Sequence, residues 1–231
     1  MRCSLFGWPL TFCLVCLLSA SALHAADNEL TPEEKAAGWQ LLFNGKDTTG
    51  WKCNTGKEVA TPVEDGSLLP HKSGGYIIAY EKPFGDFKLT CDVKMSDEEC
   101  NSGIFFRVGN LKNPVYSGFE VQVYNSKETG LHDFGAIYDL VPPQKNMNKG
   151  TNEWNHVELT CKGPLITVVV NGEEVATMNC DDYPEKGKRP DGSRHKFGVA
   201  IKDLPRSGYL GFQDHGHKCW FKNVKLLELK D

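Results

Sequence analysis

Residues 86–95 read DFKLTCDVKM, and this stretch decides the predicted fold. Every second residue from Phe87 to Met95 is apolar and the residues between them are polar, so an extended chain here has one apolar face. The same alternation returns in WNHVELTCKG, residues 154–163. Because period-two alternation is typical of strands with one buried face, both stretches predict strands that lie on a core.

The remaining patterns extend this prediction to the whole chain. PLITVVV (164–170), Asn171-Gly172 and EEVATM (173–178) predict a hairpin, since Asn-Gly readily adopts the positive φ angles of a tight turn. KCWFKNVKLLEL (218–229) predicts a last strand. Many short strands separated by turns favour an all-β fold, a two-sheet antiparallel sandwich, over parallel βαβ units.

Two stretches depart from the strand pattern. Thr31-Pro32-Glu33-Glu34 has an N-cap, a proline in the first turn and acidic residues, which predicts a short helix that ends near Gly38. Residues 181–208 are rich in Pro, Gly and charge, and predict a long loop over one end of the sandwich. Long ordered loops often carry functional residues.

Composition limits the function. The 231 residues have a formal net charge of −4, with 40% hydrophobic and 24% charged residues, an ordinary globular mixture. This balance provides no basic surface for a phosphate backbone, so nucleic acid is not an expected partner.

The N-terminus resembles a secretory signal. Arg2 is followed by the uncharged apolar stretch 10–18 and by small residues, which predicts a signal peptide over 1–26, a lead-in over 27–36 and one domain over 37–231. The alternative is a membrane anchor, but the apolar stretch is shorter than the ~20 residues of a spanning helix. We therefore expect export to the periplasm or the extracellular space, without a membrane span.

Cysteines permit cross-links but do not define them. Of nine cysteines, three lie in the predicted leader, and six remain: Cys53, Cys91, Cys100, Cys161, Cys180 and Cys219. An even number in an exported chain allows up to three disulfides, and the sequence does not select the pairs. Buried thiols are the alternative for Cys91 and Cys161, which occupy inward-facing positions of predicted strands.

Three segments place hydrogen-bonding side chains on the face opposite the core. In GFEVQVYN (118–125), NSGIFFRVG (101–109) and GYLGFQDHGHKC (208–219), apolar side chains share one face and polar ones the other. If the three strands lie in one sheet, they build a common polar surface from Asn101, Arg107, Glu120, Gln122, Tyr124, Gln213 and His215.

The composition of this surface favours a carbohydrate cleft. Solvent-exposed strand faces are ordinarily polar, and a plain solvent face is the alternative. Here amides, aromatic residues, one Arg and one His occur together, and Gly103 and Gly211 leave room for a ligand to approach. Amides bind sugar hydroxyls and aromatic rings pack on the C–H face of a pyranose, so a carbohydrate is the expected partner.

The chain also resembles a known family. In order, the matching stretches are LLFNGKDTTGW (41–51), NSGIFFR (101–107), GFEVQV (118–123), GAIYDL (135–140), EWNHVEL (153–159), the Asn-Gly hairpin (171–172), GYLGFQDHG (208–216) and CWFKNVKL (219–226). Together they are similar to the 3-keto-disaccharide hydrolase domain of exported bacterial proteins. The resemblance implies a concanavalin A-like jelly-roll sandwich and an enzyme that cleaves glycosides already oxidised to a ketone at C3.

The implied chemistry needs a base rather than two acids. A C3 ketone acidifies the neighbouring C2–H, so a base can remove that proton, the aglycone can leave from C1, and water can add to the resulting enone. A conventional glycosidase instead uses a pair of carboxylates. The neighbour of Glu120 on the polar face is the neutral Gln122, although Asp139 or Asp214 from a loop could restore a pair.

Candidate roles follow from the motifs and this implied chemistry. Glu120 is the expected general base or a metal ligand, with a solvated strand residue as its alternative. Arg107 would hold the keto or enolate oxygen or pair with Glu120, and His215 would pass a proton to the leaving oxygen. The expected substrate-binding residues are Asn101, Gln122, Tyr138, Gln213, Asp214 and His132.

A cofactor stays open at this point. A divalent cation chelated by the keto and hydroxyl oxygens would act as a Lewis acid, and Glu120, His132 and His215 are its candidate ligands, although their spacing matches no established metal motif. The sequence also leaves a non-catalytic carbohydrate-binding module and a conventional glycosidase as alternatives to a 3-keto-glycoside-cleaving enzyme.

Overall fold

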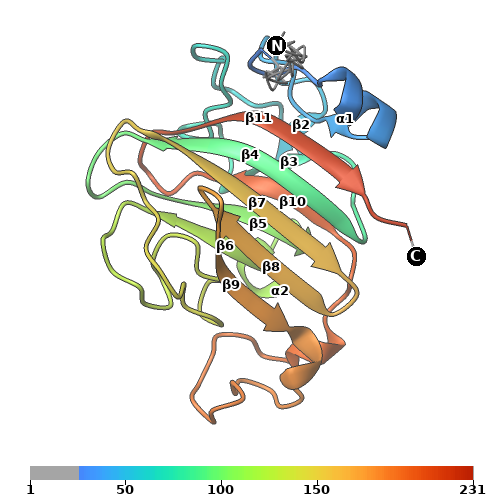
Figure 1. Ribbon diagram of the computed structural model, residues 1–231, viewed down its shortest axis with the longest axis vertical. Coiled ribbons are helices and arrows are strands. Elements are labelled where there is room, and N and C mark those ends of the chain that lie inside the picture. The colour runs from blue at the N-terminus through green and yellow to red at the C-terminus, as the bar shows by residue number, and fades with distance from the viewer. Residues whose placement is uncertain (1–25, 231) are drawn as a thin grey trace, which may run out of the picture.

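The computed structural model describes residues 26–230, which form two stacked antiparallel sheets (Figure 1). The predicted signal peptide lies outside the described residues except for Ala26. The six-stranded sheet has the order β1 (Gln40–Leu41), β11 (Cys219–Glu228), β4 (Phe87–Met95), β7 (Trp154–Lys162), β8 (Leu165–Val170), β9 (Glu173–Asn179). The five-stranded sheet has the order β2 (Trp51–Cys53), β3 (Ile77–Tyr80), β10 (Tyr209–Gln213), β5 (Asn101–Val108), β6 (Phe119–Tyr124). The predicted all-β jelly-roll sandwich is confirmed.

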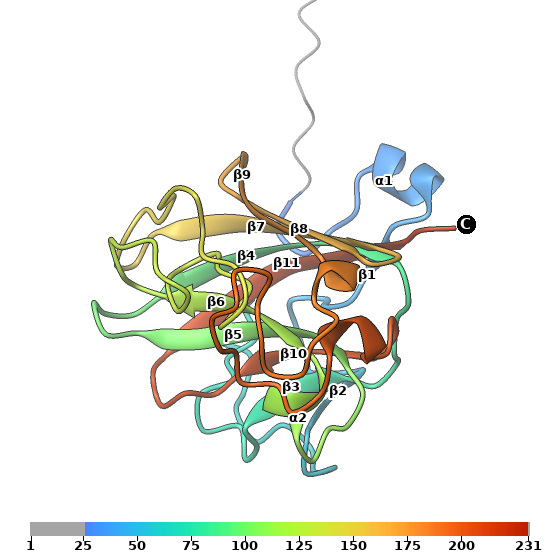
Figure 2. The same ribbon diagram turned by 90° about the horizontal axis from the view of Figure 1, so that it is seen from below.

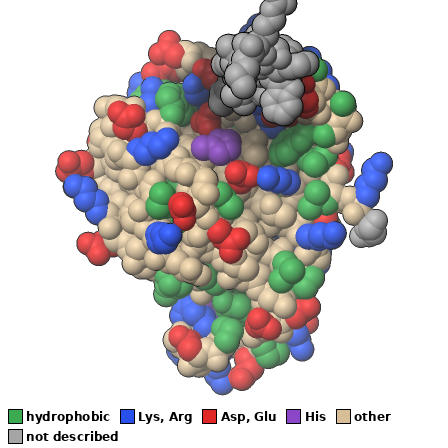
Figure 3. All heavy atoms as spheres, in the orientation of Figure 1, with side chains coloured by type: hydrophobic (Ala, Val, Ile, Leu, Met, Phe, Trp, Pro, Cys, Tyr) green, Lys and Arg blue, Asp and Glu red, His purple; other side chains and the backbone are tan. Residues whose placement is uncertain are grey.

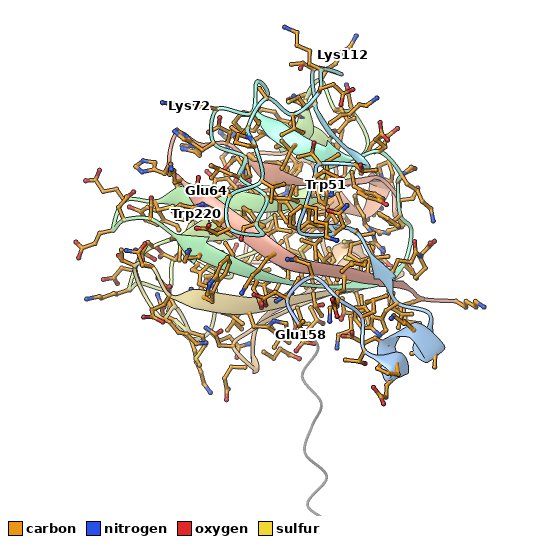
Figure 4. The ribbon with its side chains drawn as sticks, turned by 90° about the horizontal axis from the view of Figure 1, so that it is seen from above. Trp51, Glu64, Lys72, Lys112, Glu158 and Trp220 are labelled. Carbon is orange, nitrogen blue, oxygen red and sulfur yellow. The ribbon has the colours of Figure 1, made fainter. Side chains whose placement is uncertain are left out.

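The core lies between the inner faces of the two sheets, as the alternation predicts. In β4 every second residue from Phe87 to Met95 is buried and the residues between them are half-buried. Phe212 of β10 stacks on Phe221 of β11 with ring centroids 4.1 Å apart, and on Trp51 at 5.1 Å. These rings join the two sheets directly, and Figure 4 shows Trp51 between the layers. Burial of such aromatic rings is a main source of stability.

The short helix and the hairpin also form where the sequence places them. Helix α1 (Pro32–Ala37) begins with a capping box in which Thr31 and Glu34 each bind the other's backbone N–H, and it ends at Gly38 with φ 89°. In the β8–β9 hairpin, Asn171 has φ 51° and Gly172 has φ 85°, the conformation expected for an Asn-Gly turn.

Strand β5 contains a bulge that the alternation did not predict. Arg107 has φ 50°, and the pairing with β10 shifts between Phe105 and Val108. A bulge moves every later side chain of a strand to the opposite face. Val108 therefore packs in an outer apolar cluster with Ile77 and Phe105, while the Arg107 side chain turns inward. The predicted faces of Val108 and Arg107 are both wrong for this reason.

Residues 181–208 form the predicted long loop, which crosses one end of the sandwich (Figure 2). The loop includes most of the short 3-10 helix η1 (Cys180–Asp182) and all of η2 (Ile201–Asp203). A second excursion, residues 109–118 with helix α2 (Pro114–Ser117), covers part of the outer face of the five-stranded sheet. These two excursions border the polar surface of that sheet.

The outer face of the six-stranded sheet, on the opposite side of the molecule, carries side chains of both charges. Figure 3 shows acidic and basic side chains interspersed with scattered apolar groups across the outer side of the six-stranded sheet. Within residues 26–230, no helix has the length and apolar composition needed to cross a membrane.

Candidate active site

A small polar pocket opens on the outer face of the five-stranded sheet. In the register of β5 and β6, Phe105 lies opposite Glu120, Gly103 opposite Gln122 and Asn101 opposite Tyr124. The pocket has a volume of about 70 Å³. Since a water molecule occupies about 30 Å³ in the liquid, the pocket has room for only a small part of a ligand. Its lining residues are Tyr76, Asn101, Val115, Glu120, Gln122, Tyr138, Gln213 and His215.

Glu120 is the carboxylate of this pocket and is 4% exposed. Its side chain lies over Gly103, where an added Cβ would collide with Glu120 Oε1. Gly103 therefore makes room for the carboxylate itself. Burial raises the pKa of Glu120 from 4.5 to about 7, against the opposing charge of Lys196. A carboxyl group with such a pKa is poised to exchange protons at neutral pH.

Lys196 brings a positive charge to Glu120 from the loop 181–208. Its Nζ lies 4.4 Å from the centre of the Tyr138 ring, a cation–π contact beside the pocket. Burial lowers the pKa of Lys196, while the charges of Glu120 and Asp139 oppose this change. Buried Glu120 and half-buried Lys196 thus form an acid–base pair in which burial favours the neutral forms and mutual attraction favours the charged forms.

Asp139 fixes the loop that carries Lys196. Its Oδ2 accepts the Lys196 backbone N–H at 2.6 Å, and its Oδ1 accepts Arg189 Nη2 at 2.7 Å. The Asp139 carbonyl also accepts Arg189 Nη2 at 2.7 Å and Nε at 3.1 Å. Tyr138 is held next to it, because its N–H donates to the Glu120 carbonyl at 2.9 Å. This network sets the position of both Tyr138 and Lys196.

Neutral polar groups complete the pocket. Gln122 Nε2 donates to Asn101 Oδ1 at 3.1 Å, and Gln213 Nε2 donates to the Tyr76 hydroxyl at 2.5 Å. Gln213 Oε1 is buried without a hydrogen-bond partner among the described residues. A buried acceptor of this kind is suited to a substrate hydroxyl. Burial raises the pKa of Tyr76 to about 12, so its hydroxyl stays protonated and able to donate.

Most of the predicted residues meet at this pocket. Asn101, Glu120, Gln122, Gln213 and His215 all line it, as the common surface of three strands predicts, and so does Tyr138, which the family resemblance suggested. Their individual roles stay predictions.

Three predicted site residues lie elsewhere. Arg107, turned inward by the bulge, donates from Nη2 to Asp86 Oδ1 at 2.8 Å and from Nη1 to the Gly163 carbonyl at 2.9 Å. The expectation that Arg107 reaches Glu120 or the substrate pocket is therefore corrected.

Asp214 and His132 lie beside the pocket without lining it. Asp214 accepts the N–H groups of Lys72 at 2.7 Å and Gly216 at 3.0 Å, which braces the turn that carries His215. His132 is exposed and stacks on the Tyr138 ring at 4.5 Å. Both therefore support lining residues from outside.

The candidate metal ligands do not converge. Within residues 26–230, His, Cys, Asp and Glu form no group of three or more suited to hold a metal ion. Glu120 and His215 line the pocket, whereas His132 lies against Tyr138 and Asp139. The predicted set of Glu120, His132 and His215 is therefore not a ligand cage in this structure.

A larger hollow of about 600 Å³ lies on the other side of the sandwich, between the lead-in and the six-stranded sheet. It contains a contact of 2.7 Å between His156 Nδ1 and Asp92 Oδ1. Contacts with His156 and Asn223 keep the pKa of Asp92 low despite burial, so this carboxylate stays ionised. We assign the active site to the smaller pocket because it holds the carboxyl group poised near neutrality.

Sequence reasoning missed three residues of the site: Tyr76 and Val115, which line the pocket, and Lys196. Tyr76 precedes β3, whose residues Ile77–Ala79 are all buried and show no alternation. Lys196 lies in the long loop 181–208, which the sequence marked as a functional candidate without singling out a residue.

The fold and the pocket define a class of protein: a two-sheet antiparallel β-sandwich that carries one buried carboxyl group in a polar pocket on its outer face. The model of the 3-keto-alpha-glucoside-1,2-lyase-like domain matches residues 38–227. The chain belongs to this family, which confirms the resemblance found in the sequence, and it is an enzyme of the hydrolase type.

Known relatives agree with this placement. A protein of Bacteroides thetaiotaomicron named 3-keto-disaccharide hydrolase is 26% identical, over 90% of this chain and 84% of that protein. A crystal structure of a candidate glycosyl hydrolase from Parabacteroides distasonis is 30% identical with a TM-score of 0.72, over 89% of this chain and all of that one. A second one from the same organism is 26% identical, with a TM-score of 0.68, over 83% of this chain and 99% of that one.

Proposed function

We propose that this protein cleaves 3-keto-disaccharides and related 3-keto-glycosides by elimination followed by addition of water. The observation that carries the proposal is the buried carboxyl group of the small pocket, Glu120, with its pKa near 7. The family description refers to a lyase and the Bacteroides relative to a 3-keto-disaccharide hydrolase, and both names fit this chemistry.

Glu120 acts first as a base. Ionised Glu120 removes the proton from C2 of the sugar, and the electron pair of that bond forms an enolate with the C3 ketone. The Lys196 ammonium favours the ionised carboxylate before this step. The protonated Tyr76 and the Gln122 amide lie in the same pocket and can donate to the developing negative charge.

The enolate then expels the aglycone. The C1–O bond breaks, a C1–C2 double bond forms, and the leaving oxygen takes a proton, for which His215 is the candidate donor at the exposed mouth of the pocket. Water next adds to C1 and gives its second proton back to His215, while Glu120 returns a proton to C2. The sum of these steps is hydrolysis of the glycosidic bond.

The composition of the pocket disfavours double displacement. Among the residues that line it, Glu120 is the one carboxylate, whereas a conventional glycosidase sets two carboxyl groups on either side of the bond. Asp139 and Asp214, which could have restored a pair, are held in contacts with backbone and arginine groups instead. Proton abstraction next to a ketone needs only one base.

Products separate these possibilities. The purified protein is incubated with a 3-keto-disaccharide and with its unoxidised parent, with and without a chelator, and products are followed by mass spectrometry. We expect cleavage of the 3-keto sugar alone and exchange of the C2 hydrogen with deuterium from solvent. Cleavage of the parent sugar, or binding of the 3-keto sugar without cleavage, would contradict the proposal.

The place of action is part of the same proposal. The signal-like residues 1–26 support export to the periplasm or the extracellular space. Fractionation of cells that express the full chain tests this, with recovery of the shortened protein outside the cytoplasm as the expected result.

A further inference from the structure

Two of the six cysteines after residue 26 lie next to each other in the fold. All six are buried and carry free thiols. Cys100 and Cys219 are close enough for each thiol to affect the pKa of the other. In addition, Cys100 Sγ lies 3.3 Å from the carbonyl oxygen of Lys218, the residue next to Cys219. The fold thus selects one pair where the sequence left the choice open.

Backbone contacts hold this pair together. The Ser96 N–H donates to the Lys218 carbonyl at 3.1 Å, and the Cys100 N–H donates to the Asp97 carbonyl at 3.3 Å. Cys219 is paired with Met95 at the end of the β4–β11 ladder. Since both short segments are fixed on the same strand end, the thiols meet without a rearrangement of the sheets.

We propose that Cys100 and Cys219 form a disulfide when the chain folds in the presence of a disulfide-bearing oxidant. Each cysteine gives up one S–H proton and one electron. The two electrons reduce the oxidant disulfide to two thiols, and one Sγ–Sγ bond forms in the protein. Glutathione disulfide is sufficient for this step in vitro. In cells the step requires an oxidising compartment, such as the one that the predicted export would provide.

Burial determines when the two thiols can react. In the folded chain the neighbouring Cys219 thiol lowers the pKa of Cys100, whereas burial raises the pKa of Cys219. Because both thiols are buried in the folded chain, this exchange takes place while residues 96–100 and 217–219 are still open.

The bond would join the two sheets beside the active site. Cys100 directly precedes β5 and Asn101 of the pocket, in the five-stranded sheet. Cys219 begins β11 of the six-stranded sheet and follows the turn that carries His215. A bond here closes a long loop of the chain and restrains the unfolded state, so it stabilises the folded protein.

Peptide mapping tests the pairing. The full chain is refolded from denaturant in a reduced and oxidised glutathione buffer, alkylated, digested without reduction and analysed by mass spectrometry. We expect a peptide pair linked through Cys100 and Cys219, in the wild type and in a Cys91→Ala control that removes another buried thiol.

Thermal unfolding supplies an independent measurement. The Tm of the oxidised wild type should fall by about 5–10 °C on reduction, and the Tm of Cys100→Ala should not respond. Should Cys100→Ala fail to fold, the wild-type peptide map decides alone. Recovery of Cys100 and Cys219 as alkylated thiols after oxidative refolding, or linked to any other cysteine, overturns the proposal.

Discussion

Replacement of Glu120 by Gln should abolish turnover and, at the same time, stabilise the folded protein in a pH-dependent way. The substitution keeps the shape of the side chain above Gly103 but removes the base. Loss of a positioned general base ordinarily costs a factor of about 10² to 10⁴ in rate. Binding of the 3-keto sugar should persist, because the amides and phenols of the pocket are unchanged.

The stability change follows from the raised pKa. The folded-state pKa of Glu120 is about 7 and its ordinary value is 4.5. The folded protein therefore binds this proton more tightly than the unfolded chain, and it loses stability as the pH rises from 4.5 to about 7. Well above pH 7, ionisation of buried Glu120 lowers the free energy of unfolding by about 3 kcal/mol. The neutral amide of the Glu120→Gln protein would carry no such cost.

Chemical denaturation at two pH values measures this effect. Between pH 5 and pH 8.5, the free energy of unfolding of Glu120→Gln relative to the wild type should increase by roughly 2–3 kcal/mol, or roughly 4–12 °C in Tm. The exposed Glu153→Gln is the matched control and should show a pH-independent difference near zero. The wild-type kcat/KM should rise with pH, with its midpoint at about pH 7, and should reach a plateau at higher pH.

Two results would refute this reasoning. Substantial turnover by Glu120→Gln would show that another group removes the proton. A stability difference that does not change with pH would show that Glu120 has an ordinary pKa and hence no tuned role as a base.

Three further substitutions test the surroundings of this carboxyl group. Lys196→Met should shift the acidic limb of the pH–rate profile to higher pH, because an attractive charge is lost, while the exposed Lys202→Met on the same loop leaves the profile unchanged. Gly103→Ala should lower kcat/KM at least tenfold by displacing the carboxylate, whereas an added Cβ in Gly85→Ala meets no atom within 4 Å and should be silent in the same assay. Arg107→Met should destabilise the protein by about 3 kcal/mol in denaturant titrations, since it leaves a partly buried acid unpaired, with KM unchanged. An altered KM with normal stability would contradict this and would show that Arg107 takes part in substrate binding.

The sequence by itself determined the two-sheet architecture and most of the pocket. Period-two alternation reports which side chains face the core, so the three segments that carry Asn101, Glu120 and Gln213 revealed a shared polar face before any strand order was known. Alternation is a local property of the chain, and local properties can be read without the fold. The capped helix α1 and the Asn-Gly hairpin were predictable for the same reason.

Tertiary structure alone decided the direction of the Arg107 side chain, the approach of Lys196 to Glu120 and the pKa of Glu120. The positive φ of Arg107 moves its side chain from the pocket to Asp86, because a bulge reverses the alternation that the prediction extended through it. Lys196 reaches Glu120 only through the folding of a loop anchored on Asp139, which lies 57 residues away along the chain. The raised pKa of Glu120 likewise arises from burial by distant segments. Such contacts depend on packing in space, and the order of residues along the chain does not encode them locally.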